Sequence, residues 1–155
     1  MIGWLVDTNV IASLIAPNGA PSVKGWGRAV DERRLFNSIL TLAEYDKGIA
    51  NLAGDDPNVP RYIAAEMRLR PVSPLEYCRS ATPSSVAGGA ISGRVKRETG
   101  HPPPVIDTLL AATAIEADLY LVSHNTKDLQ HCGAAVFDPW RDDIAAFPLK
   151  PPRRR

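Results

Sequence analysis

Apolar residues in this chain form short runs that are separated by stretches with helical spacing. Four runs have the length and composition of buried strands. They are Gly3–Val6, Leu35–Leu40, Leu119–Val122 and a weaker run at Ala134–Phe137. Strands that alternate with helix-compatible stretches predict an α/β fold, with a parallel sheet of four to five strands and helices on both faces.

Helices are predicted in the longer segments between these strands. In the segment 41–52, apolar residues recur at spacings of three and four. Two helical pieces are expected over 75–98, because Thr82-Pro83 and Gly88-Gly89 interrupt the pattern. The segment 105–117 is apolar or small nearly all round, which predicts burial on more than one side. The other expected helices are 8–16, 21–33 and 62–69.

The composition indicates one globular domain. At 155 residues, with 45% hydrophobic and 23% charged residues, the chain is long enough to bury a single core. We expect that domain to cover 1–147 and the Pro/Arg-rich tail 148–155 to be disordered. No apolar run has the length of a membrane span and no signal-type segment is present, so a cytoplasmic location without membrane association is predicted.

Charge and cysteine usage exclude some classes of function. The net charge is only +1, so any affinity for a phosphate backbone must come from local patches. Cys78 and Cys132 stand far apart with no C-x-x-C motif, which argues against a structural zinc site. No Gly-rich phosphate loop is present.

Two aspartates stand where an α/β fold builds its sites. Asp7 directly follows the first predicted strand, and the carboxyl ends of parallel strands line binding crevices. Asp107 lies in the first turn of a helix that otherwise looks buried, where an ionised carboxylate needs a cation or hydrogen-bond donors. The helix dipole and free N–H groups could also accommodate it. Thr8 and Asn9, next to Asp7, could be helix caps or could steady Asp7.

Two further acids lie beside apolar segments, each with an open alternative. Glu44 stands at the margin of its helix's apolar stripe and Asp46 on the other side, so helix geometry does not choose between them. Asp128 follows the strand Leu119–Val122 by six residues and could be a surface charge. Asn125, between that strand and Asp128, could face the site or cap a helix.

The four acids together predict one carboxylate cluster. Oxygen ligands without histidine or cysteine favour a hard cation, so Mg²⁺ or Mn²⁺ is the expected metal. Such a cluster suits hydrolysis of a phosphodiester by an activated water.

Four motifs in this order resemble the PIN-domain ribonucleases. They read LVDTNV, S-x-L-T-L-A-E, ID-x-L-L-A-A-T-A and LVSHN-x-x-D, and the likeness extends from residue 2 to about residue 140. Pro139-Trp140 resembles the Pro-Trp with which the VapC-like and FitB-like toxin branch tends to close. The chain departs from the family's fourth motif, where His124 replaces an arginine and Leu129 a phenylalanine.

This resemblance implies a fold, a function and roles for particular residues. It implies a three-layer PIN-like sandwich and a metal-dependent endoribonuclease, acting as the toxin of a toxin–antitoxin pair. The expected partners are an RNA substrate, a cognate antitoxin and a second copy in a homodimer. It selects Glu44 over Asp46. The implied catalytic and metal-binding residues are Asp7, Glu44, Asp107 and Asp128, supported by Thr8, Asn9 and Asn125.

Two other functions compete with this interpretation. A catalytically degenerate PIN fold would serve as a binding or scaffold module, although all four acids are present. A haloacid-dehalogenase-like phosphatase also carries an aspartate after its first strand. That chemistry requires a second aspartate two positions later, where this chain has Asn9.

Overall fold

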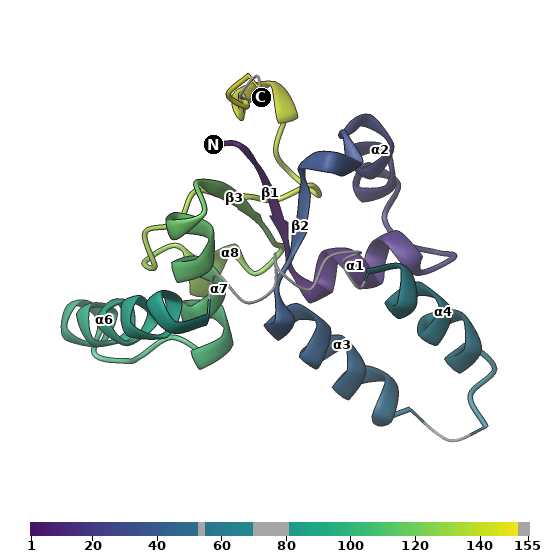
Figure 1. Ribbon diagram of the computed structural model, residues 1–155, viewed down its shortest axis with the longest axis horizontal. Helices are drawn as coiled ribbons and strands as arrows, with labels where there is room; N and C mark the ends of the chain where they lie inside the picture. The colour runs from purple at the N-terminus through teal and green to yellow at the C-terminus, as the bar shows by residue number, and fades with distance from the viewer. Residues whose placement is uncertain (53–54, 70–80, 152–155) are drawn as a thin grey trace.

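Among the described residues, the sheet has four parallel strands in the spatial order β2-β1-β3-β4. This computed structural model describes residues 1–52, 55–69 and 81–151 (Figure 1). The four strands confirm the predicted parallel sheet. Their bounds are β1 (Gly3–Val6), β2 (Leu35–Asn37), β3 (Leu119–Val122) and β4 (Val136–Phe137).

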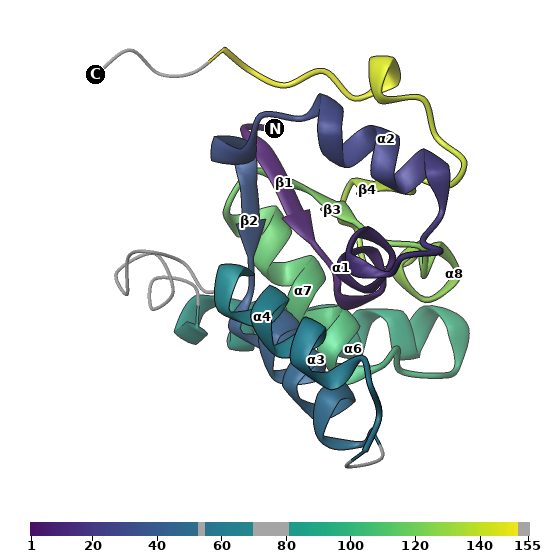
Figure 2. The same cartoon turned by 90° about the vertical axis from the view of Figure 1, so that its right-hand side faces the viewer.

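Helices cover both faces of the sheet, as predicted, and make three layers (Figure 2). Neighbouring side chains on a strand point to opposite faces. Trp4 on β1 packs with Trp26 at a ring distance of 5.9 Å. Trp26 belongs to α2 (Pro21–Ala29), which lies with α1 (Thr8–Ile15) on this face. Leu5 points to the other face and packs in a core cluster with α7 (Val105–Glu116).

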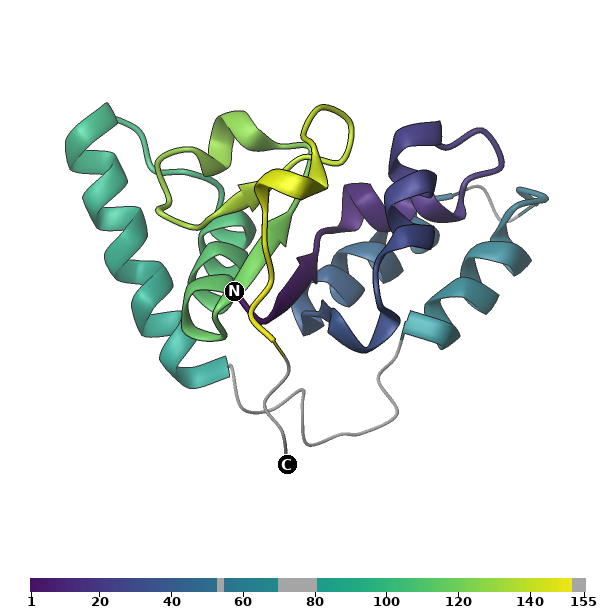
Figure 3. The same ribbon diagram turned by 90° about the horizontal axis from the view of Figure 1, so that it is seen from above.

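The helix α7 is buried along most of its length, which confirms the prediction from its composition. It packs against α6 (Ala81–Thr99), which covers it (Figure 3). The prediction of two helical pieces is wrong for 81–99, where α6 is one helix. Pro83 falls in the first turn, where a proline is tolerated. Residues 75–80 of that prediction lie outside the described residues.

The boundary between β2 and α3 (Ile39–Ala50) lies earlier than predicted. The strand expected to reach Leu40 ends at Asn37. Ser38 then caps the helix, because its Oγ accepts a hydrogen bond from the backbone N–H of Leu40 at 3.2 Å. A capped helix start therefore replaces the last three residues of the predicted strand.

The remaining elements connect the strands and helices described above. After α2, the expected helix over 21–33 ends early and gives way to a short 3₁₀ turn. The additional elements are η1 (Glu32–Arg34), α4 (Val59–Leu69), α8 (Thr126–Leu129) and η2 (Ile144–Ala146). In the described part of the chain, no helix is long and apolar enough to cross a membrane.

The segment that follows η2 returns to the amino end of β1. The backbone N–H of Lys150 donates to Met1 O at 2.8 Å, and its Nζ lies 2.6 Å from an Asp118 carboxylate oxygen. Residues 152–155 of the expected disordered tail lie outside the described residues. The division of the chain at residue 147 stays a prediction.

Candidate active site

A cavity of about 400 Å³ opens at the carboxyl edge of the sheet and is acidic. Its walls come from the end of β1, from α1, α3 and α7, and from the loop after β3. Three of its lining residues are acids, and no basic residue is among the described residues that line it. The lining residues are Asp7, Thr8, Asn9, Ala12, Glu44, Asp107 and Asn125.

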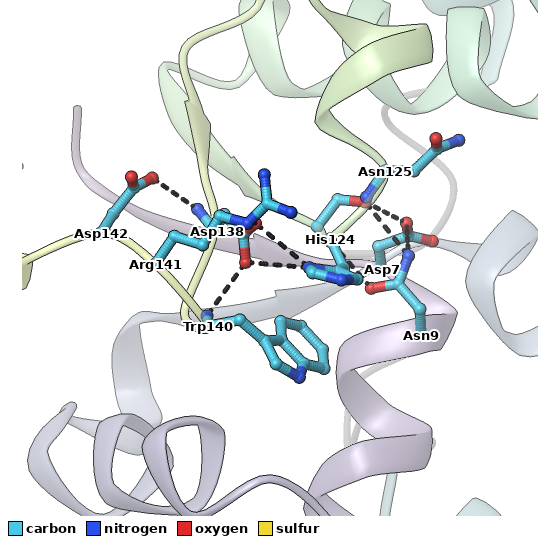
Figure 4. A network of polar contacts seen from close by, with 9 residues as sticks. Asp7, Asn9, His124, Asn125, Asp138, Trp140, Arg141 and Asp142 are labelled. Atoms are coloured by element: carbon cyan, nitrogen blue, oxygen red, sulfur yellow. Dashed lines mark hydrogen bonds and ion pairs between the residues drawn. The ribbon is translucent and has the colours of Figure 1, made fainter.

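The carboxylate of Asp7 is buried and fixed by three donors. Its Oδ1 accepts a hydrogen bond from the backbone N–H of Thr8 at 2.6 Å, which makes Asp7 the N-cap of α1. Its Oδ2 accepts from Asn9 Nδ2 at 2.6 Å (Figure 4) and from Ser123 Oγ, also at 2.6 Å. Donors of this kind hold the carboxylate in one orientation.

Glu44, rather than Asp46, faces this cavity. Thr8 Oγ1 donates to Glu44 Oε2 at 2.9 Å, whereas the side chain of Asp46 is exposed on α3 and is not part of the lining. The helix is held against the sheet by Thr41, whose Oγ1 donates to Val6 O at 3.2 Å. The start of α3 is therefore joined to the end of β1, which brings Glu44 close to Asp7.

Asp107 meets the other acids from α7. Asn125 Nδ2 donates to its Oδ2 at 2.8 Å. Burial raises the pKa of the Asp107 carboxyl to about 6, and repulsion from the negative charges of Asp7, Asp128 and Glu44 adds to the shift. Asp107 is thus close enough to the other three predicted acids for their charges to act on it.

Asp128 stands apart from the cavity wall. It lies exposed on α8 and is not among the lining residues, although its charge contributes to the raised pKa of Asp107. Asn125, assigned a supporting role from the sequence, lines the cavity instead. The role of each residue stays a prediction. Asn125 lines the cavity that Asp7, Glu44 and Asp107 also line, whereas Asp128 does not.

Ser123, which is fully buried beside Asp7, was not predicted from the sequence. Strand register provides a signal for it. Val6 pairs with Val122 across β1 and β3, so the next residues, Asp7 and Ser123, are neighbours at the sheet edge. Asp138, also missed and buried, follows β4 in the same way.

The cavity offers the types of ligand atom that the predicted metal prefers, but not, among its described residues, a group of side chains placed to hold it. In the described part of the chain, no three histidine, cysteine, aspartate or glutamate side chains are grouped so that they could hold a metal ion. The chemistry of the lining nevertheless suits a hard cation, because it offers carboxylate and amide oxygens. A cation would also offset the repulsion that adds to the effect of burial on the pKa of Asp107.

An acidic cavity at the carboxyl edge of a parallel sheet, with helices on both faces, is the arrangement that the motifs predicted for a PIN domain. Comparison with solved structures confirms this fold. The chain superposes on a chain of FitAB bound to an IR36 DNA fragment with a TM-score of 0.74 and 24% identity, covering 90% of this chain and 97% of that one. For VapBC-1 from nontypeable Haemophilus influenzae, the TM-score is 0.69 at 22% identity, with 91% and 100% covered.

Two curated proteins are similar in sequence. Toxin FitB of Neisseria gonorrhoeae is 25% identical over 141 residues, which cover 89% of this chain and 99% of FitB. Ribonuclease VapC14 of Mycobacterium tuberculosis is 30% identical over 60 residues, or 39% of this chain and 58% of VapC14. No protein-family model matches the chain. The predicted resemblance to the VapC-like and FitB-like toxins is confirmed.

Proposed function

We propose that this chain is an endoribonuclease that acts as the toxin of a toxin–antitoxin pair. The observation that carries the proposal is the convergence of Asp7, Glu44 and Asp107 on one cavity whose described lining has no basic residue. Similarity to a named toxin over 89% of the chain, and over a shorter stretch to a named ribonuclease, supports the same assignment.

The proposed activity depends on Mg²⁺ or Mn²⁺. Asp7, Glu44 and Asp107 are the proposed metal ligands, and they would have to move closer together around the ion than they stand in the described structure. Asp128 would complete or orient the surroundings of the metal. When bound, such a cation supplies Lewis acidity to the phosphate and to the attacking water. The donor chemistry of the cavity and the mutual repulsion of its carboxylates support this dependence.

The contribution of the chain itself is to hold charge in place before the substrate arrives. The three donors to Asp7 hold its carboxylate in one orientation. Thr8 directs Glu44, and Asn125 directs Asp107, each through one hydrogen bond. Supporting contacts of this kind orient the carboxylates before the substrate arrives, which is how preorganised sites lower a barrier.

Cleavage of matched oligonucleotides tests this proposal. The purified chain, free of any bound inhibitor, is incubated with an RNA and a DNA of the same single-stranded sequence, with Mg²⁺, with Mn²⁺ or with EDTA. We expect cleavage of RNA that EDTA abolishes. Absence of cleavage across a set of varied RNA sequences would favour the degenerate, scaffold-type alternative.

We also propose that the antitoxin covers an apolar groove next to the acidic cavity. This groove has a volume of about 310 Å³ between α1, α3 and α4, and it shares Thr8, Ala12 and Glu44 with the cavity. Its lining also includes Tyr45 and Ile49. An apolar segment seated there would stand over the entrance to the acids, which connects antitoxin binding to inhibition. Assembly as a homodimer remains a prediction.

A further inference from the structure

The imidazole of His124 is fixed beside the acidic cavity by a buried carboxylate. His124 follows β3 by two residues and Asp138 follows β4 by one, and the pairing of Val122 with Phe137 makes them neighbours. The Nδ1 atom of His124 lies 3.2 and 3.1 Å from the two carboxylate oxygens of Asp138. One edge of the imidazole is therefore occupied by a hydrogen bond.

One face of the same ring is covered by Trp140. The ring centroids of His124 and Trp140 are 4.4 Å apart with an interplanar angle of 36°. Trp140 is itself held in place, because its backbone N–H donates to Asp138 Oδ1 at 2.9 Å. Asp138, at 1% exposure, thus fixes both members of the stack.

Part of this side chain is open to solvent. The His124 side chain remains 45% exposed although Trp140 packs on its ring and Asp138 occupies its Nδ1. A flat, immobilised ring that is partly accessible is what an unpaired nucleotide base stacks on, and histidine is among the residues that RNA-binding proteins use for it.

This ring also lies next to the acids. The backbone N–H of His124 donates to Asn9 Oδ1 at 3.1 Å, and the amide of Asn9 donates to Asp7. Figure 4 shows His124 between Asp138 on one side and Asn9 with Asp7 on the other. A base seated on this ring would place its own phosphate beside the cavity.

Stacking would also help an anionic RNA strand to bind at this acidic site. RNA is anionic, whereas the described lining of the cavity carries three carboxylates and no basic residue. The loop after β4 adds Asp138, Asp142 and Asp143 against Arg141. Base stacking does not depend on the sign of the surrounding charge, so it can hold a strand where attraction to phosphate is weak.

We propose that His124, stacked on Trp140 and fixed by Asp138, is the base-stacking residue for one unpaired nucleotide next to the bond that is cleaved. This inference rests on the proposed function and adds a requirement to it. The substrate must be single-stranded at that nucleotide, and its base must be present.

Binding of modified RNA tests this inference. A single-stranded RNA is used as the parent, with versions that are abasic on the 5′ or the 3′ side of the cleaved bond. Affinity is measured by fluorescence anisotropy in the Asp7→Asn background, and kcat and KM are measured in the active chain. The variants are His124→Ala, His124→Phe and, as a matched control, His101→Ala, which also removes an exposed imidazole.

We expect His124→Ala to weaken binding and raise KM roughly tenfold, while His124→Phe keeps affinity within about twofold because a ring remains. One of the two abasic RNAs should bind the parent chain about tenfold more weakly than the intact RNA does. The same abasic RNA should bind His124→Ala no more weakly than the intact RNA does. His101→Ala should match the parent, and melting temperatures should show that each variant is folded.

Two results would overturn the inference. One is unchanged RNA binding by folded His124→Ala. The other is an abasic penalty of equal size with and without the imidazole. Failure of the proposed function is distinguishable, because the unmutated chain would then cleave no RNA, whatever residue stands at 124.

Discussion

Ser123 Oγ donates a 2.6 Å hydrogen bond to Asp7 Oδ2, and both side chains are buried although the residues are 116 positions apart. The same hydroxyl oxygen accepts from Asn9 Nδ2 at 3.1 Å and from the backbone N–H of Asn125 at 3.0 Å. One serine therefore connects Asp7 with two other residues that line the acidic cavity.

Replacement of Ser123 by alanine should disturb activity more than stability. Loss of a residue that orients a metal-binding carboxylate typically costs tenfold or more in activity or metal affinity. We expect kcat/KM for RNA to fall about tenfold and the free energy of unfolding to fall by about 1 kcal/mol. Steady-state cleavage and thermal melts measure the two effects. Ser22→Ala, on the exposed side of α2, is the control, and equal activity of the two variants would contradict the assigned role.

Ionisation of Asp107 should destabilise the metal-free fold. Its pKa of about 6 in the folded chain lies above the ordinary value of 3.8, so the folded state binds more protons between these values. Stability should therefore decrease as pH rises from about 4 to about 6. Asp107→Asn should then be the more stable chain at pH 7.5, by ~1 kcal/mol after solvent screening or about 3 °C in Tm.

Thermal melts of both chains at pH 4 and pH 7.5, in EDTA, measure this difference. At pH 4 the advantage of Asp107→Asn should nearly vanish. Saturating Mg²⁺ at pH 7.5 should make the unmutated chain melt at the higher temperature of the two, since a bound cation stabilises the carboxylate. A stability gain that does not change with pH would show that ionisation of Asp107 is not its cause.

The two adjacent glycines of α6 should respond in opposite directions. A Cβ on Gly88 would lie 2.8 Å from Leu109 Cδ2 on α7, whereas a Cβ on Gly89 would meet nothing within 4 Å. Gly89→Ala should raise the free energy of unfolding by roughly 1 kcal/mol through helix propensity. Gly88→Val should lower it by about 1–3 kcal/mol through overpacking. Urea unfolding of both variants tests this, and similar shifts in the two variants would contradict the close packing of α6 on α7.

The sequence predicted the framework of this fold well and its helix ends less well. The apolar patterns at Gly3–Val6 and Leu119–Val122 were sufficient to predict β1 and β3, because buried parallel strands are continuously apolar. The interruption expected at Gly88-Gly89 did not occur, because Gly88 packs against Leu109, a contact that a single sequence does not reveal.

The site was predictable where it depends on strand ends and less so elsewhere. Asp7 follows directly from its position after β1. The choice of Glu44 over Asp46 needed the family resemblance, because it depends on how α3 is joined to Val6. Asp138 depends on the short strand β4 and on a contact with His124, and its sequence context alone does not indicate a buried carboxylate.

Filling the apolar groove should separate antitoxin binding from RNA cleavage. Gly48 lines the groove on an exposed side of α3, and a Cβ added to it would meet nothing within 4 Å. Gly48→Gln should leave RNA cleavage unchanged and reduce affinity for the co-expressed antitoxin at least tenfold, as measured by calorimetry. Lys47→Gln, one position earlier on the same helix, is the control. Full antitoxin affinity of Gly48→Gln would place the antitoxin elsewhere.

Cleavage of total cellular RNA by the unmutated chain, by Asp7→Asn and by Asp46→Asn is the most direct test of the acidic cavity as a ribonuclease site. All three chains are assayed with Mg²⁺, Mn²⁺ or EDTA, and their melting temperatures are compared. We expect discrete products from the unmutated chain and from Asp46→Asn, none from folded Asp7→Asn, and none in EDTA. Equal cleavage by folded Asp7→Asn would contradict the assignment of this cavity as the ribonuclease site.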